Sequence, residues 1–385
     1  MTAAAVRPVS GFAILGTADE EEWSDVLDCC VQHDFYHLPR YHRLAEARGE
    51  GTAQCFVYRD GEHLIALPLL VRPVSADEPD GWKDATSVYG YCGPVASSAA
   101  LPAEVVAKFH EGLARMLAGQ RIVSVFSRLH PLLEQRDLLA GLGESRPAGQ
   151  TVSIDLTLAP ETQRAQYSGT YRTRINKLLR NGVTCTLDRE QRHLTEFAEM
   201  YHETMRRVHA HGSYFFGADY FTELSRELDG RLQLFVAELD NELIAGGLFT
   251  LCDGIVQYHL GATRDAFLRL SPMGLVIDTA RAWGTAEGAR VCHLGGGVGS
   301  KEDSLFKFKA GFSDRRHRFE TWRWVTAPEV YSRLNEQRTR LNELGGLVPV
   351  SPDYFPAYRC PTAAAVNASS ELAARDLQAS EAEHE

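Results

Sequence analysis

The chain has 385 residues, of which 44% are hydrophobic, 24% charged and 9% aromatic. This globular composition provides apolar material for a large core and excludes disordered, collagen-like and coiled-coil proteins. A formal net charge of −11 disfavours a general nucleic-acid coat protein, so any contact with RNA must be local. At roughly 100 to 200 residues per domain, the length predicts about two domains.

The eight cysteines form no Cys-x-x-Cys pair. This argues against a zinc site and against a disulfide scaffold, and we expect reduced thiols and no bound metal. No window approaches the ~18 apolar residues that span a bilayer, and the first residues do not show the pattern of a secretory leader. We therefore expect a cytoplasmic protein without a membrane span.

The first part of the chain is predicted to be one α/β unit, at residues 1–150. We expect a helix at 20–30, two strands around an Asp-Gly turn within 55–74, a helix at 103–117 and a strand within 121–133.

A second unit is predicted at residues 151–350, beginning with an alternating strand at 151–158. Strands joined by polar turns follow within 232–263, and their pattern resembles that of the first hairpin. This similarity favours two related α/β units in tandem. The tail, 363–385, is rich in Ala, Ser and Glu and lacks aromatic residues, so we predict that it is disordered.

The segment YRTRINKLLRNG, residues 171–182, is predicted to form a basic amphipathic helix. Its aliphatic side chains occupy one arc of the helical wheel and its cations the other. The cations are Arg172, Arg174, Lys177 and Arg180. A solvated surface helix explains this pattern, but four cations without an acid between them would also suit a polyphosphate or an RNA backbone.

A glycine triplet, Gly295, Gly296 and Gly297, precedes the segment SLFKFKAGF at 304–312. Glycines allow the backbone to approach a ligand closely and leave amides free to donate hydrogen bonds. Apolar residues recur at helical spacing in the following segment, although Phe and Lys alternate over four residues as in a strand. An aromatic core with exposed lysines explains this pattern equally well.

A helix start is predicted at Ser271 as N-cap and Pro272 as first helical residue. Acyl-coenzyme A transferases of the GNAT type carry an Arg/Gln-x-x-Gly-x-Gly/Ala loop at such a junction. Only Gly274 is present here, and Pro272 lacks an amide donor, which disfavours coenzyme A binding at this helix.

Several segments resemble, in order, the Fem-type aminoacyl-tRNA-dependent peptidyl transferases. They are DFYHLPRYHRL (34–44), YGYCGPV (89–95), FSRLHPLL (126–133), YRTRINKLLRNGV (171–183), YFF (214–216), IAGGL (244–248), LGGG (294–297) and SLFKFKAGF (304–312). The resemblance spans about residues 35–324 and implies an α/β (α+β) fold of two tandem GNAT-like domains, in a compact form without the family's helical arm. It implies transfer of an amino acid from tRNA to the primary amine of a peptidoglycan precursor or an antibiotic intermediate.

The resemblance also assigns roles to residues. Lys309 would hold the terminal tRNA phosphates or the developing oxyanion, and Phe308 would stack near the terminal adenosine. The predicted tRNA contacts are Arg172, Arg174, Lys177, Lys307 and Arg315. The predicted substrate-binding residues are Tyr89, Tyr91, Tyr214, Tyr258, Gly295, Gly296 and Gly297. Aminoacyl-tRNA is a co-substrate, no cofactor is needed, and the general base is not identified.

Two alternatives remain open. The first is a GNAT-like N-acyltransferase that uses acyl-coenzyme A or a carrier-bound acyl group. The second is a non-catalytic RNA-binding protein on a decayed transferase fold, which would keep the glycine triplet and Phe308–Lys309 for packing alone.

Overall fold

The computed structural model describes residues 11–75, 80–133, 135–208, 210 and 212–364. The helices are α1 (Glu20–Asp28), α2 (Pro39–Ala47), α3 (Ala103–Gly119), α4 (Pro160–Ala165), α5 (Gly169–Arg180), α6 (Leu194–Arg207), α7 (Ala218–Glu227), α8 (Met273–Ala286), α9 (Ser304–Ala310) and α10 (Pro328–Leu344). The strands are β1 (Gly11–Leu15), β2 (Thr52–Asp60), β3 (His63–Pro73), β4 (Lys83–Thr86), β5 (Val95–Ala96), β6 (Ile122–Arg128), β7 (Glu144–Asp155), β8 (Thr184–Asp188), β9 (Leu232–Leu239), β10 (Glu242–Cys252), β11 (Ile255–Thr263), β12 (Val291–Gly295), β13 (Arg316–Val325), β14 (Leu347–Pro349) and β15 (Thr362–Ala364).

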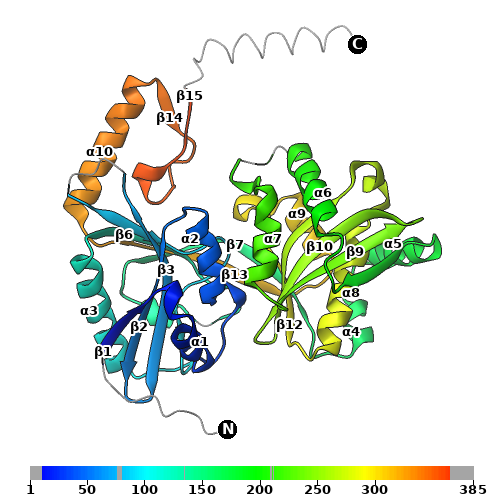
Figure 1. Cartoon of the computed structure of the whole chain (residues 1–385), viewed down its shortest axis with the longest axis horizontal. Coiled ribbons are helices and arrows are strands. Elements are labelled where there is room, and N and C mark those ends of the chain that lie inside the picture. The colour runs from blue at the N-terminus through cyan, green and yellow to red at the C-terminus, as the bar shows by residue number, and fades with distance from the viewer. Residues whose placement is uncertain (1–10, 76–79, 134, 209, 211, 365–385) are drawn as a thin grey trace.

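One mixed sheet runs through both halves of the molecule. Its strand order is β1-β2-β3-β4-β6-β13-β7-β12-β11-β10-β9-β8, and β5 pairs with β3. We call the part built on β1 to β6 the first lobe and the part built on β7 to β12 the second lobe (Figure 1). Strand β13 follows the second lobe in the chain but lies between β6 and β7, so it joins the lobes.

Most predicted elements are confirmed. The first-lobe helices α1 and α3 and the hairpin β2–β3 lie where periodicity and the Asp-Gly turn placed them. In the second lobe, β9, β10 and β11 form the predicted antiparallel strands, and α5 is the predicted basic helix. The segment that fitted either a helix or a strand forms the helix α9.

The predicted start of α8 is wrong by one residue. Ser271 has a φ of 55° in the left-handed region, and Pro272 occupies the N-cap position. Because the Ser271 side chain caps no amide of α8, the chain enters this helix through a turn instead of a hydroxyl cap.

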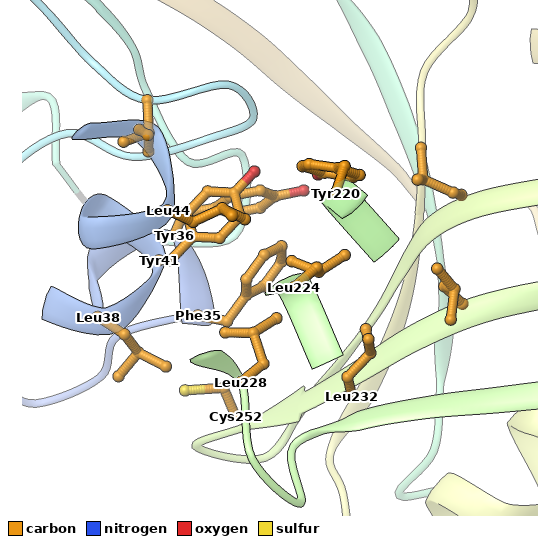
Figure 2. Close-up of a cluster of buried hydrophobic side chains, with 14 of the residues drawn as sticks. Phe35, Tyr36, Leu38, Tyr41, Leu44, Tyr220, Leu224, Leu228, Leu232 and Cys252 are labelled. Carbon is orange, nitrogen blue, oxygen red and sulfur yellow. The ribbon is translucent and has the colours of Figure 1, made fainter. Parts of the chain in front are cut away.

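A single hydrophobic cluster crosses between the lobes (Figure 2). It joins side chains of the segment before α2 and of α2 itself with side chains of α7 and of the strands next to it. Its labelled members are Phe35, Tyr36, Leu38, Tyr41, Leu44, Tyr220, Leu224, Leu228, Leu232 and Cys252. Shared burial of this kind fixes how the two lobes are oriented toward each other.

The C-terminal part of the described chain returns to the first lobe. Helix α10 contacts β6, and Tyr358 donates a hydrogen bond of 3.1 Å to the buried Asp84, which also pairs with Arg72 at 2.6 Å. Residues 363 and 364 belong to β15, and the rest of the predicted tail lies outside the described residues. The division at residue 150 falls within β7 and stays a prediction.

The eight cysteines all lie in described segments and form no disulfide. No described helix is long and apolar enough to cross a membrane.

Candidate active site

One carboxylate connects the glycine triplet to α9. Asp303 caps this helix, because its Oδ1 accepts a hydrogen bond of 2.9 Å from the Phe306 amide. Its Oδ2 accepts a second one, of 3.1 Å, from the amide of Val298. The loop that follows β12 is thereby held against the first turn of α9, and Lys309 lies in the last turn of the same helix.

Lys309 is 8% exposed, and its Nζ donates a 2.7 Å hydrogen bond to the Gly296 carbonyl. The ammonium also lies 5.6 Å from the ring centroid of Tyr258. Burial lowers the pKa of Lys309 to about 8, and the charge of Asp303 opposes this shift. The site therefore holds a desolvated cation that remains mostly protonated at neutral pH.

The glycines permit this close packing. Gly295 has a φ of 76°, and a Cβ there would lie 3.3 Å from the Nζ of Lys309 and 3.8 Å from the Tyr91 hydroxyl oxygen. A Cβ at Gly297 would lie 2.1 Å from the Lys301 carbonyl oxygen. The predicted glycine triplet thus lies beside Lys309 and leaves room for side chains from both lobes.

Tyr91 enters this site from the first lobe. Its ring packs 5.0 Å from that of Phe319 and 5.5 Å from that of His293. Burial raises the pKa of Tyr91, and a hydrogen bond with the Gly296 backbone opposes the rise. Tyr91 and Lys309, which are separated by more than half of the chain, thus contact the same glycine residue.

The other predicted tyrosines occupy two places. Tyr258 lies beneath Lys309, while Tyr89 and Tyr214 form an edge-to-face pair from opposite lobes, 6.2 Å between ring centroids. Tyr89 is 38% exposed, and burial raises the pKa of its hydroxyl. The aromatic residues chosen from the sequence therefore line the junction of the lobes, with Lys309 at one end.

Phe308 lies apart from the Lys309 ammonium. It is half-buried, and its ring lies 5.7 Å from that of Tyr171 in α5 and 5.4 Å from that of Phe312. The two residues of the Phe-Lys pair therefore face different neighbours, and the stacking role of Phe308 stays a prediction.

The predicted basic surface borders α9. Ser168, which caps α5, donates its backbone amide to the Gly311 carbonyl over 2.8 Å. All of the predicted RNA-contacting cations are exposed: Arg172, Arg174, Lys177, Lys307 and Arg315. Arg315 forms a 2.8 Å ion pair with Asp155, whereas Arg172, Arg174 and Lys177 of α5 have no ion pair within the described part of the chain.

The first turn of α8, where GNAT enzymes hold coenzyme A, is covered. A Cβ at Gly274 would lie 3.7 Å from Ile175 of α5 and 3.9 Å from Phe312. Gly274 is buried and Pro272 lacks an amide donor, which disfavours binding of a pyrophosphate at this helix end.

Two buried histidines that sequence reasoning did not select flank Tyr91. The Nε2 of His130 lies 3.1 Å from an oxygen of Asp34, and the Leu132 amide donates to its Nδ1. His130 therefore carries its proton on Nε2 and donates to Asp34. His293 precedes the predicted triplet by two residues, a signal that could have identified it, whereas Asp34 and His130 are 96 positions apart.

The tautomer of His293 follows from its partner. Gln257 donates its side-chain amide to the Tyr258 carbonyl, so its Oε1 accepts from the Nδ1 of His293 over 2.6 Å. Burial lowers the pKa of His293 well below its usual value. A neutral imidazole next to Tyr91 and the glycine triplet adds no charge that would compete with the Lys309 ammonium.

A cavity of about 790 Å³ lies elsewhere at the lobe junction and does not include Lys309. Half of its lining residues are charged, and some of these charges are already paired, as Glu20 is with Arg40 at 2.5 Å and Glu227 is with the neighbouring Arg43 at 3.1 Å. The cation and the hydroxyl groups gathered at Lys309 lie outside this cavity.

Comparison with known proteins supports an acyltransferase fold. Residues 165–307 match the family described as Acetyltransferase (GNAT) domain. The structure of FemX is 14% identical with a TM-score of 0.64, and the match covers 81% of this chain and 97% of that chain. L-PGS from Bacillus licheniformis is 15% identical with a TM-score of 0.51, covering 79% of this chain and 91% of that one. A conserved protein of unknown function from Bacteroides thetaiotaomicron is 13% identical with a TM-score of 0.52, covering 81% and 99%.

No curated protein matches the chain by sequence. At the identities above, the structural likeness shows a shared fold. The predicted α/β fold of GNAT-like units and the resemblance of this fold to that of Fem-type proteins are confirmed.

Proposed function

We propose that this chain, which has the fold of FemX, transfers an amino acid from aminoacyl-tRNA to the primary amine of an acceptor and so forms an amide. The observation that carries the proposal is the buried Lys309 ammonium, fixed 2.7 Å from the Gly296 carbonyl beside tyrosines of both lobes. A desolvated cation of this kind stabilises negative charge that develops during acyl transfer.

The reaction needs few functional groups. The neutral amine attacks the ester carbonyl carbon and forms a carbon–nitrogen bond, and the carbon–oxygen bond to the tRNA ribose breaks. The amine proton passes to the leaving ribose oxygen, so atoms and charges balance without a redox step. Positioning of two substrates is worth a large part of the barrier, and the Lys309 ammonium contributes a few kcal/mol as an oxyanion donor.

The basic face of α5 supports tRNA as the donor. Arg172, Arg174 and Lys177 are exposed next to α9, which carries Lys309 and Lys307. These cations would bind the phosphates of the acceptor stem although the whole chain has a net charge of −11. The covered start of α8 disfavours acyl-coenzyme A as the donor.

The test is transfer of a labelled amino acid from a charged tRNA mixture to a panel of primary amines. We expect product formation to stop after RNase treatment. We also expect the kcat/KM of the transfer to fall at least 100-fold with Lys309→Met. The control is Lys108→Met, which removes an exposed lysine of α3 in the first lobe and should change kcat/KM less than threefold.

Other outcomes select the alternatives. Transfer from acyl-coenzyme A that survives RNase would establish the N-acyltransferase. If Lys309→Met bound tRNA and showed the same activity as the unchanged chain, packing alone would explain the presence of Lys309. This result would favour the non-catalytic alternative.

A further inference from the structure

Three arginines share one face of the strands that join the lobes. Thr321 of β13 pairs with Arg128 of β6 on one side and with Arg146 of β7 on the other. Directly paired residues project from the same face of a sheet, as do residues two apart in one strand, so Arg323 lies on this face too. We call Arg128, Arg146 and Arg323 the arginine row.

The arginine row continues the candidate active site. Phe319, two residues before Thr321 on the same strand, packs 5.0 Å from the Tyr91 ring. A strand rises about 3.3 Å per residue, so Thr321 lies roughly 7 Å beyond this contact. The neighbouring Trp322 points to the opposite face, into the core of the first lobe.

The positive charge of the arginine row is only partly balanced. Arg146 pairs with Glu144 at 2.8 Å, and Arg323 donates to the Asp353 carbonyl over 3.0 Å. The Nε of Arg323 is buried without a hydrogen-bond partner.

Arg128 has no carboxylate partner. It is half-buried, and no ion pair to it occurs among the residues that the structure describes. Its charge acts on the hydroxyl groups of both Tyr89 and Tyr91. A partly desolvated cation without a counter-ion is costly and favours an anion that arrives with a ligand.

We propose that the arginine row binds an oxyanion group, phosphate or carboxylate, carried by the amine acceptor. The guanidinium group presents planar paired donors that match both of these anions. The inference rests on the proposed function, because an acceptor between Tyr89 and Tyr91 would place its amine toward Lys309 and its anion on Arg128. Arg128 would then determine which amines the protein accepts.

The tRNA is the less suitable occupant. The cations of α5 border α9 through the contact of Tyr171 with Phe308, whereas the arginine row borders Tyr91 through Phe319. Figure 1 shows α5 at the outer end of the second lobe and β13 at the junction between the lobes. The arginine row therefore lies on other elements than the cations of α5 and borders the candidate active site on the side of the first lobe.

The test measures binding of inorganic pyrophosphate and of succinate to the full chain by calorimetry. We expect at least one of these anions to bind, and the comparison of their affinities shows whether the site prefers phosphate or carboxylate. The affinity of the preferred anion should fall at least tenfold with Arg128→Gln. Arg146→Gln, an exposed position, gives a second variant that should fold and should also weaken binding. Arg115→Gln, which removes an exposed arginine from α3, is the matched control and should bind as the unchanged chain does.

The proposal is overturned if neither anion binds or if Arg128→Gln binds the anion normally. It is also overturned if Arg128→Gln weakens the binding of uncharged tRNA tenfold while Arg174→Gln, at a predicted tRNA contact, does not. The assay contains no transfer step. Failure of the proposed function in the transfer assay is thus distinguishable from failure of the anion site.

Discussion

At the scale of a single residue, Lys309 has an unusual pKa because its side chain is buried. An exposed lysine has a pKa near 10.5, whereas burial lowers that of Lys309 to about 8. The resemblance to Fem-type enzymes selected this residue, because the Phe-Lys pair that carries the resemblance is a local pattern. It could not show that Phe308 would face Tyr171 while Lys309 faces Gly296.

This pKa predicts how activity depends on pH. If the ammonium form of Lys309 stabilises the transition state, its fraction falls as the pH rises through about 8, and kcat/KM falls with it. An arginine stays charged over this range, so Lys309→Arg should lose the decrease near pH 8 whatever its absolute rate. Both proteins are assayed with the same donor and acceptor from pH 6 to pH 9.5, which removes the acceptor's own titration from the comparison. A decrease that persists unchanged in Lys309→Arg would assign it to another group.

The residues around Tyr91 show the limit of sequence reasoning at this scale. His130 and Asp34 form a buried pair from positions 96 apart, and Arg128 is one of many arginines in the chain. No local pattern distinguishes such residues, because their role depends on which strands become neighbours.

At the scale of elements, local patterns predicted α1, α3, α5 and the strands of both hairpin regions, whereas α2, α4, α6, α7 and α10 were not predicted. The basic helix α5 has the expected division into apolar and cationic faces, with Ile175 and Leu178 buried. The segment around Phe308 fitted two periodicities and became a helix because Asp303 caps it and its apolar side packs on α5. Tertiary contacts decided between two structures of similar local propensity.

The loop between β12 and α9 gives a test at this scale. A Cβ at Gly297 would lie 2.1 Å from the Lys301 carbonyl and 2.3 Å from Asp303 Oδ1, so Gly297→Ala must displace the loop that holds Lys309. We expect a loss of about 1–3 kcal/mol in the free energy of unfolding, measured with urea, and at least a tenfold loss of kcat/KM.

Gly119→Ala is the matched control for this substitution. A Cβ there meets no atom within 4 Å, and the residue ends α3 far from the site in the chain. Its free energy of unfolding should stay the same or rise by up to about 1 kcal/mol. Equal behaviour of the two alanine variants would show that the glycine loop has no packing constraint.

At the scale of the whole molecule, the two lobes share a sheet and a core. Strand β13 pairs with strands of both lobes, and the cluster in Figure 2 contains side chains of both. We therefore expect the lobes to unfold together, although each has the size of an ordinary domain.

Phe35→Ala tests this coupling. Phe35 is fully buried in the shared cluster, and its truncation should lower the free energy of unfolding by about 3–5 kcal/mol. Hydrogen exchange read by mass spectrometry should show faster exchange in β2 of the first lobe and in β10 of the second by the same factor. Val31→Ala, at a position 60% exposed, is the control and should change neither. Wild-type protection of β10 in Phe35→Ala would show that the lobes unfold separately.

The sequence by itself determined the local structure of this protein: the helix periods, the hairpin turns, the basic face of α5, and the glycine triplet with Lys309 close behind it. These features depend on residues a few positions apart, where backbone geometry and side-chain spacing fix the result. Only the tertiary structure decided that β13 lies between β6 and β7, that Tyr91 reaches Gly296, and that the charge of Arg128 acts on the Tyr91 hydroxyl. The pairing of distant strands depends on the burial of the whole chain, which no short segment encodes.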